Sequence, residues 1–341
     1  MHGRLLVTGI RGSGPGDPLF ESDLLACVDA RVGGVILFDV DVPTGADDPL
    51  DAPRNVLSQD QLKNSIRVVR ECLGPDAWIS VDQEGGRVAR LNDRRGFVND
   101  PSAREFASMD EVQRRRAARN QAERLAELGF DLDFAPCVDL ELDPQNRVIA
   151  SLDRSYGADA QSVIAAASVV LDAHAEAGVA ACLKHFPGHG SSRDDTHEGV
   201  VDVTETWVGD ELEPYRALCA RPGVAVMAAH VVHRGLDPDL PASLSAKVLG
   251  DLLRGELGFE GVIVTDSIDM HAISQGFSPA GAAVRAVQAG ADLVVDGFNL
   301  DPRREHPAKA LVAALRTAIP ERRVEESIAR IDSLRTQIGH A

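Results

Sequence analysis

Eight short apolar runs, rich in β-branched residues, recur along the 341-residue chain. Most of them are continuous rather than alternating, which is typical of parallel strands that are covered on both faces. Segments with a helical spacing of apolar residues lie between them. Eight strand–helix units in a chain of this length predict an α/β fold, a (β/α)8 TIM-type barrel, with residues 1–341 forming a single domain. The runs span residues 5–7, 34–38, 78–81, 131–136, 181–183, 224–228, 261–264 and 292–295.

The predicted helices carry start and stop signals. Ser58 and Gln61 match a capping box, and Leu62 and Ile66 begin an apolar face at helical spacing. A glycine follows several of the other helices, where a left-handed residue can end them. A doubly wound sheet is the alternative fold, but no GxGxxG motif follows an early strand. The other helices are expected at residues 112–128, 163–177, 245–257, 280–289, 308–318 and 324–338, and a surface loop at 39–53.

Charge and cysteine content exclude several classes of function. The net charge of −18 argues against a nucleic-acid partner and against anionic membrane surfaces, because both would repel the protein. The five cysteines are scattered and form no CxxC pair, which suits a reducing compartment and indicates no structural metal. The N-terminus has too short an apolar core for a signal peptide, and no run is long enough to span a bilayer. We therefore expect a cytoplasmic protein without a structural metal. We also expect it to be a monomer and to need no cofactor.

A dense group of proton-transfer side chains follows the fifth run. Residues 184–197 read KHFPGHGSSRDDTH, which holds three imidazoles, an ammonium and two carboxylates. A strand cannot continue through the Pro and Gly residues of this stretch. Lys184 and His185 are therefore expected at the carboxyl end of a strand, and His189, Asp195 and His197 on the loop that follows. This concentration predicts an active site.

Polar side chains also stand at the carboxyl ends of the other predicted strands. In a barrel these ends face the same side, where catalytic sites are built. Acids, arginines, a lysine and histidines converge there with few apolar interruptions, and such a rim suits a hydroxyl-rich ligand. Outside the stretch above, these side chains are Asp82, Glu84, Arg87, Arg90, Asp139, Arg154, His230, Asp266, Asp269 and Asp296.

Four motifs in these positions resemble glycoside hydrolase family 3. They read DQEGG at 82–86, KHFPGHG at 184–190, DTH at 195–197 and TDS at 265–267. The resemblance runs from the second to the eighth strand and is greatest to single-domain bacterial β-N-acetylglucosaminidases of cell-wall recycling. It implies a retaining exo-enzyme that removes terminal GlcNAc from muropeptide fragments through a covalent glycosyl-aspartate. A β-glucosidase or a glycoside phosphorylase on the same scaffold is the alternative.

The resemblance also implies roles for individual residues. Asp266 matches the nucleophile, His197 the general acid/base, and Asp195 the carboxylate that orients the histidine. Retaining hydrolysis needs a carboxylate on one side of the anomeric carbon and a proton donor on the other, and histidine titrates near neutrality. The remaining matches hold the sugar or line its site, and they are Asp82, Arg90, Arg154, Lys184, His185 and His230.

Structural roles are the alternative for single residues. Asp266 can cap the helix after strand seven, Asp195 can form a loop turn, and Lys184 can simply pair with a carboxylate. Glu84 fits a supporting anchor better than a catalyst. Two departures from the family pattern also stand out, because Ser191 replaces the usual Asp or Asn and residues 146–154 hold extra residues.

Three rival functions use the same side chains. A metal hydrolase would take histidines as ligands, but strand one offers Val7-Thr8-Gly9 where such barrels carry His-x-His. A Schiff-base aldolase would use Lys184. A sugar-binding barrel without activity is disfavoured by the intact Asp195, His197 and Asp266.

Overall fold

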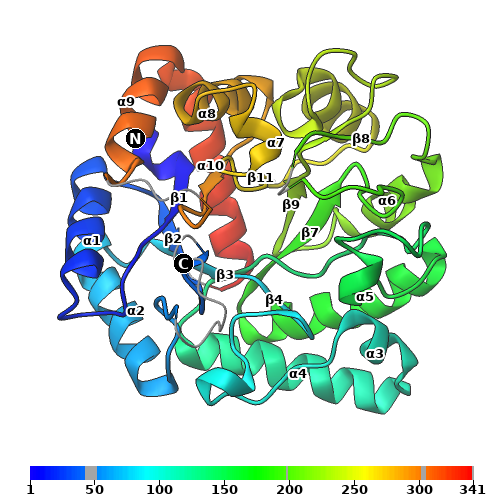
Figure 1. The fold of residues 1–341 in the computed structure, drawn as a ribbon, viewed down its shortest axis with the longest axis horizontal. Coiled ribbons are helices and arrows are strands. Elements are labelled where there is room, and N and C mark those ends of the chain that lie inside the picture. The colour runs from blue at the N-terminus through cyan, green and yellow to red at the C-terminus, as the bar shows by residue number, and fades with distance from the viewer. Residues whose placement is uncertain (43–51, 197–198, 301–304, 340–341) are drawn as a thin grey trace.

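Eight parallel strands form a barrel with helices around it in the computed structural model, which describes residues 1–42, 52–196, 199–300 and 305–339 (Figure 1). The strands follow the order β11-β9-β7-β6-β3-β2-β1-β12, and a parallel bridge between Val264 and Leu293 joins the two ends of this order. The predicted (β/α)8 barrel and its eight strands are thereby confirmed. The strands are β1 (Leu6–Gly9), β2 (Gly34–Ile36), β3 (Trp78–Val81), β6 (Leu132–Asp133), β7 (Ala180–Phe186), β9 (Val224–Ala228), β11 (Ile263–Thr265) and β12 (Val294–Asp296).

Helices alternate with these strands, and short elements decorate the loops. The long helices are α1 (Pro18–Ala30), α2 (Gln59–Leu73), α4 (Glu111–Leu128), α5 (Ala160–Ala177), the π-type helix η8 (Lys247–Glu256), α8 (Pro279–Ala289), α9 (Ala308–Ala318) and α10 (Glu321–Gln337). The shorter helices are η1 (His2–Leu5), η4 (Asp93–Arg95), α3 (Ala103–Ser108), η5 (Ala150–Leu152), η6 (Gly209–Leu212), α6 (Glu213–Leu218), η7 (Ala242–Leu244) and α7 (His271–Ser274). Two minor sheets pair β4 (Gln83–Gly85) with β5 (Val88–Ala89), and β8 (Val201–Asp202) with β10 (Val231–Val232).

The predicted helices are present, with small differences at their ends. Ser58 caps α2 by accepting from Gln61 N, but the Gln61 side chain accepts from Leu57 N instead of completing the predicted capping box. The expected surface loop at 39–53 lies partly outside the described residues. Among the helices that the structure describes, none is both long and apolar enough to cross a membrane.

Strand β7 is the longest strand of the barrel and brings the KHFPGHG segment to the carboxyl face. It lies between β6 and β9, and all seven of its residues are buried. Pro187 follows directly and has no N–H for a further ladder bond. Lys184 and His185 therefore lie at the carboxyl end of a fully buried strand, as predicted.

The opposite, amino-terminal end of the barrel is held by a buried carboxylate. Asp292, just before β12, accepts from Ile263 N and Ser327 Oγ, and from the guanidinium groups of Arg254, Arg323 and Arg330. In barrels of this type the amino-terminal end serves stability rather than chemistry.

We expect Asp292→Asn to lower the free energy of unfolding by roughly 3 kcal/mol, because it leaves three partly buried guanidinium groups without their buried anion. Activity per folded molecule should stay within about twofold, since the change lies at the end remote from the site. Urea denaturation and steady-state kinetics measure the two quantities. Arg322→Ala, which removes an exposed ion pair with Glu326, should change stability by less than about 1 kcal/mol.

Candidate active site

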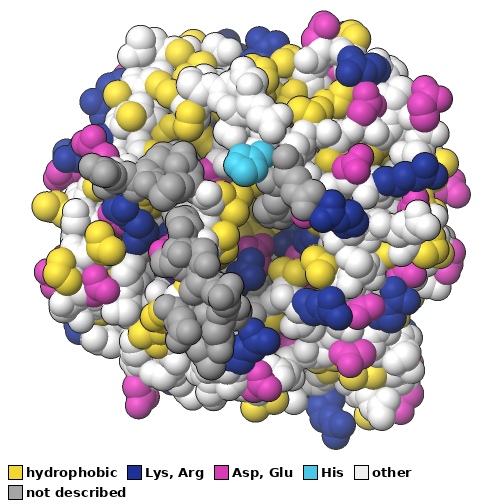
Figure 2. Space-filling model, in the orientation of Figure 1, with side chains coloured by type: hydrophobic (Ala, Val, Ile, Leu, Met, Phe, Trp, Pro, Cys, Tyr) yellow, Lys and Arg dark blue, Asp and Glu magenta, His cyan; other side chains and the backbone are white. Residues whose placement is uncertain are grey.

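The predicted site residues come from five neighbouring strands or the turns after them. Asp82 follows β3, Arg154 lies in the loop after β6, Lys184 and His185 lie in β7, His230 follows β9, and Asp266 follows β11. The space-filling view shows a hollow near the middle of one face, with acidic and basic side chains in it (Figure 2). Barrel strands of parallel direction thus bring these groups to one end, as the sequence predicted.

Charged side chains of alternating sign form a continuous network across this end. Lys184 Nζ lies 2.9 Å from Asp82 Oδ1 and 2.6 Å from Glu84 Oε1. Arg154 donates two hydrogen bonds to Glu84, at 2.8 and 2.7 Å. Arg90 lies 3.4 Å from the other oxygen of Asp82. Each buried charge is therefore compensated by a neighbour of opposite sign, as burial requires.

These contacts set the protonation states of the network. Burial alone would raise the pKa of the Asp82 and Glu84 carboxyls. The positive charges of Lys184 and Arg90 instead lower the pKa of Asp82. Those of Arg154 and Lys184 hold the pKa of Glu84 far below its usual range. Burial would lower the pKa of Lys184, but Asp82 and Glu84 outweigh it and raise that pKa. Lys184 therefore stays an ammonium. A Schiff-base aldolase needs a neutral amine, so the structure disfavours that rival.

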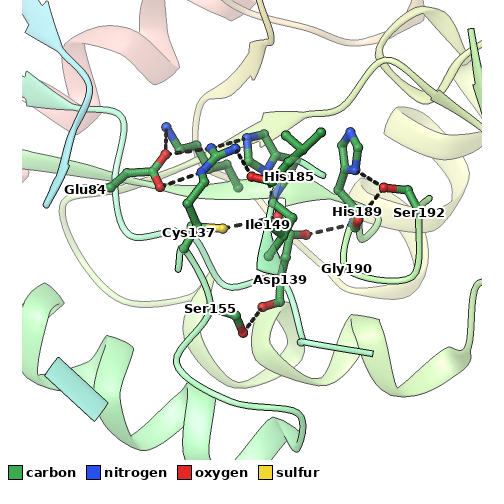
Figure 3. Close-up of polar contacts among 12 residues, drawn as sticks. Glu84, Cys137, Asp139, Ile149, Ser155, His185, His189, Gly190 and Ser192 are labelled. Carbon is green, nitrogen blue, oxygen red and sulfur yellow. Dashed lines mark hydrogen bonds and ion pairs between the residues drawn. The ribbon is translucent and has the colours of Figure 1, made fainter. Parts of the chain in front are cut away.

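His185 links this network to a buried carboxylate, Asp139, which sequence reasoning did not single out as a site residue. Arg154 Nη2 lies 3.1 Å from His185 Nε2, and since a guanidinium only donates, Nε2 must be the acceptor. The proton is then on Nδ1, which donates to Asp139 Oδ2 over 2.6 Å (Figure 3). Burial would raise the pKa of Asp139, but the interaction with His185 and hydrogen bonds lower it to about 2. Asp139 thus fixes the tautomer and the orientation of His185.

Three side chains at this point also form a candidate metal set. Ligand atoms of Cys137, Asp139 and His185 all lie within 4.8 Å of one another. Cys137 Sγ donates to Asp139 Oδ2 over 3.3 Å, and burial raises the pKa of this thiol well above its ordinary value. The positive charge of Arg154 lies beside His185. These contacts favour a hydrogen-bonded network, and the expected absence of a metal stays a prediction.

The loop after β7 is anchored through His189. Its backbone N–H donates to Asp139 Oδ1 over 2.8 Å, and its Nδ1 lies 2.7 Å from Ser192 Oγ (Figure 3). Asn146 Nδ2 donates to His189 O over 2.9 Å and to Gly190 O over 3.2 Å. Burial, with the nearby His185, lowers the pKa of His189 to about 4, so its ring is neutral near pH 7. His189 is therefore a structural centre of the loop.

The predicted catalytic dyad lies farther along this loop. Asp195 is partly exposed, and its carbonyl accepts from Gly199 N over 3.2 Å. Thr196 is buried, and its carbonyl accepts from Ala272 N over 3.1 Å. His197 lies outside the described residues, so its predicted role stays a prediction.

Asp266 stands on a turn that His230 holds. Its backbone N–H donates to Ala228 O on β9, its Oδ1 accepts from Ser267 N over 2.7 Å, and its side chain is partly exposed. His230 Nε2 donates to Ser267 O over 2.9 Å. The helix after β11, α7, has Met270 as its N-cap, so the alternative of Asp266 as a helix cap is wrong.

Segment 146–154 folds back so that Arg154 reaches this network. Asn146 Oδ1 accepts from Val148 N and Ile149 N, which folds the segment back into η5. Arg154 Nη1 then donates to Val148 O over 3.1 Å. The predicted sugar-binding residues Asp82, Arg90, Arg154, Lys184 and His185 are thus brought into one network.

Comparison with known proteins identifies the family. The family model described as "Glycosyl hydrolase family 3 N terminal domain" matches residues 23–334. This chain belongs to glycosyl hydrolase family 3. The family resemblance and the expectation of a glycoside hydrolase are confirmed.

Relatives within family 3 are similar in sequence and in structure. The beta-hexosaminidase LpqI of Mycobacterium tuberculosis is 39% identical over 269 residues, which cover 75% of this chain and 67% of LpqI. A solved family 3 β-N-acetylglucosaminidase of Paenibacillus sp. FPU-7 matches with a TM-score of 0.84 and 33% identity, over 99% of this chain and 62% of that chain. The solved M. tuberculosis LpqI matches with a TM-score of 0.81 and 32% identity, over 98% of this chain and 92% of that chain. All share the barrel described above.

We expect acid to destabilise this family 3 protein partly through Asp139. Its folded pKa of about 2 lies below the ordinary value of 3.8, so its contribution is present above pH 4 and is lost as pH falls toward 2. The wild type should therefore lose about 2 kcal/mol more of its unfolding free energy between pH 5 and pH 2 than Asp139→Asn loses. Urea titrations at several pH values measure this difference. Equal losses in the two proteins would contradict the assignment, and the exposed change Asp60→Asn serves as a control.

Proposed function

We propose that this chain is a retaining exo-β-N-acetylglucosaminidase. The observation that carries the proposal is the alternating-charge network of Asp82, Lys184, Glu84 and Arg154 at the barrel end that also bears Asp266. Charged donors and acceptors held in place in this way suit the hydroxyl groups of a sugar. The relatives' names, beta-hexosaminidase and β-N-acetylglucosaminidase, support an acetamido sugar.

The reaction proceeds in two displacements at the anomeric carbon. Asp266 attacks this carbon, and the bond to the leaving group breaks as His197 gives its proton to the departing oxygen. Water then attacks the same carbon, His197 takes a proton from it, and the bond to Asp266 breaks. The hydrogen bond from Ser267 N orients the Asp266 carboxyl, and Asp195 orients His197.

Exposure divides the binding residues into two groups. The side chains of Asp82 and Arg90 are 17% and 24% exposed, whereas those of Lys184 and Glu84 are 3% and 4% exposed. Asp82 and Arg90 therefore contact sugar hydroxyls directly. Arg154, Lys184 and His185 form the more deeply buried part of the subsite, and His230 lines it beside Asp266. Glu84 acts from behind as the anion that holds the two cations.

Finer features of the proposal rest on the family resemblance. The substrate is a GlcNAc-capped muropeptide fragment, and residues 1–341 act as one catalytic domain in a monomer. The five cysteines all lie within the described residues and are free, which supports the cytoplasm as the compartment. A β-glucosidase or a glycoside phosphorylase is the competing function.

A panel of aryl β-glycosides, with and without phosphate, tests the sugar and the acceptor. We expect the N-acetylglucosaminide to be cleaved with a kcat/KM at least ~100-fold above that of the glucoside, because the two sugars differ by a polar group that the site must recognise. Asp266→Asn should lose several orders of magnitude in rate while keeping its thermal transition. Preference for the glucoside would replace the proposal by the β-glucosidase, and release of glycosyl phosphate would replace it by the phosphorylase.

His197→Ala tests the acid/base assignment. Cleavage of an aryl substrate with a good leaving group needs little protonation, so the first step should survive while hydrolysis of the covalent intermediate slows by ~100-fold or more. Intact-protein mass spectrometry should then show one added sugar on the protein, and azide should speed its release as a β-glycosyl azide. Asp195→Ala should show a milder form of the same behaviour. An equal loss on good and poor leaving groups, with no adduct, would show that His197 is not the acid/base.

A further inference from the structure

Glu211, on the short helix η6, contacts the loop that follows β7. Its side chain is buried, and its Oε2 accepts from Gly190 N over 3.1 Å. Its Oε1 accepts from Val208 N over 3.4 Å. The carboxyl also fills the place of a side chain at Gly188, where an added Cβ would lie 2.5 Å from Oε2. Nearby, Trp207 Nε1 donates to Pro187 O over 3.0 Å.

Packing alone does not require a carboxyl at this position. Glu211 accepts hydrogen bonds from the neutral backbone N–H groups of Gly190 and Val208, and burial, with the negative charge of Asp139, raises its pKa to about 7. A buried acid without a compensating cation costs stability, which an apolar side chain of similar volume would avoid. The carboxyl adds its bonds to Gly190 N and Val208 N, and only the first of them joins η6 to the loop after β7.

The other contacts of the loop show what that bond determines. Residues 187–190 are held by Trp207 and Glu211 from the segment before α6, and by Asp139 and Asn146 from the loop after β6. A second anchor is Thr196, whose carbonyl accepts from Ala272 N, and between the two anchors Asn146 Nδ2 donates to Ser192 Oγ and Arg193 Nε donates to Asp143 Oδ2. Asp195 lies between these two anchors, next to the second. The contacts of residues 187–190 therefore fix the point at which the chain leading to Asp195 leaves the barrel.

We infer that Glu211 is a positioning residue of the reaction, which acts by fixing the loop 187–196 that carries Asp195. This inference rests on the proposed function, in which Asp195 orients the acid/base. Loss of the Gly190 contact should misplace the dyad and leave the charged sugar subsite intact, because the subsite is held by its own ion pairs. A displacement of about 1 Å is enough to lower a rate by about 100-fold.

Leaving-group dependence distinguishes positioning from a merely structural role. Glu211→Gln keeps the shape but sets an NH2 group against one of the two backbone N–H groups, and Glu211→Leu removes both acceptors. With a poor leaving group we expect kcat to fall by ~10-fold for the first variant and by ~100-fold for the second. With a dinitrophenyl leaving group the first step needs little protonation, so its rate in a pre-steady-state burst should change by less than about threefold. KM for the poor substrate should stay near the wild-type value, because the sugar subsite is unchanged, whereas KM for the dinitrophenyl substrate should fall together with kcat as hydrolysis of the intermediate slows.

Asp131→Asn is the matched control. It also changes a buried carboxylate to an amide, but Asp131 pairs with Arg70 before β6, at the amino-terminal end of the barrel. It should lower stability and act equally on the two substrates. Trp207→Phe changes a partly exposed residue and removes the bond to Pro187, so it should lower the rate with poor leaving groups by a smaller factor. This variant keeps the test available if the Glu211 variants do not fold.

His197→Ala, measured in the same series, separates the two proposals. If His197→Ala shows the leaving-group effect, and the folded Glu211 variants and Trp207→Phe lower both rates equally or not at all, the positioning role of Glu211 is overturned. If His197→Ala shows no such effect, the proposed acid/base is wrong. A rate loss confined to poor leaving groups in the Glu211 variants would then still show that Glu211 positions the true proton donor on this loop.

Discussion

The site depends on the ion pairs that the buried ammonium group of Lys184 makes with Asp82 and Glu84. A cation at the end of a fully buried strand is tolerated only with anions in contact, and Asp82 and Glu84 provide them from the turn after β3 and from β4. Because Glu84 is shared with Arg154, the loop after β6 is drawn into the same arrangement. One buried charge on β7 thus fixes the relative positions of segments that are far apart in sequence.

The same electrostatics divide the titratable groups by role. Asp82, Glu84 and Asp139 are held as anions, because the pKa of each is lowered by its neighbours. None of them is a proton donor near neutral pH, which removes Glu84 as an alternative general acid. His189 is neutral and enclosed, and its pKa is lowered to about 4. This division supports a donor on the loop beyond Thr196, where the family resemblance puts it.

Sequence reasoning found the barrel and the rim because both depend on local patterns. Continuous apolar runs predict covered parallel strands, and strand ends in a barrel share one face. The roles of Asp139 and Glu211 could not be predicted in this way. Their partners, His185 and Gly190, lie 46 and 21 residues away, and no periodicity links such positions. For Asp139 a signal existed, a carboxylate just after the fourth run, whereas Glu211 follows an exposed segment that looks like ordinary surface loop.

The glycines of KHFPGHG show why so specific a heptapeptide occurs at this place. A Cβ at Gly190 would lie 1.8 Å from Leu140 O, and a Cβ at Gly188 would meet the Glu211 carboxyl. The φ of Gly188 is +134°, which side chains rarely adopt. Because Gly188 and Gly190 have no side chains, the backbone can pass this close to Glu211 and Leu140. This path brings His189 N to Asp139. This heptapeptide, which carries the family resemblance, is therefore the part of the chain that must turn sharply from a buried strand into the loop bearing Asp195. Packing constrains its sequence as much as the chemistry of its histidines does.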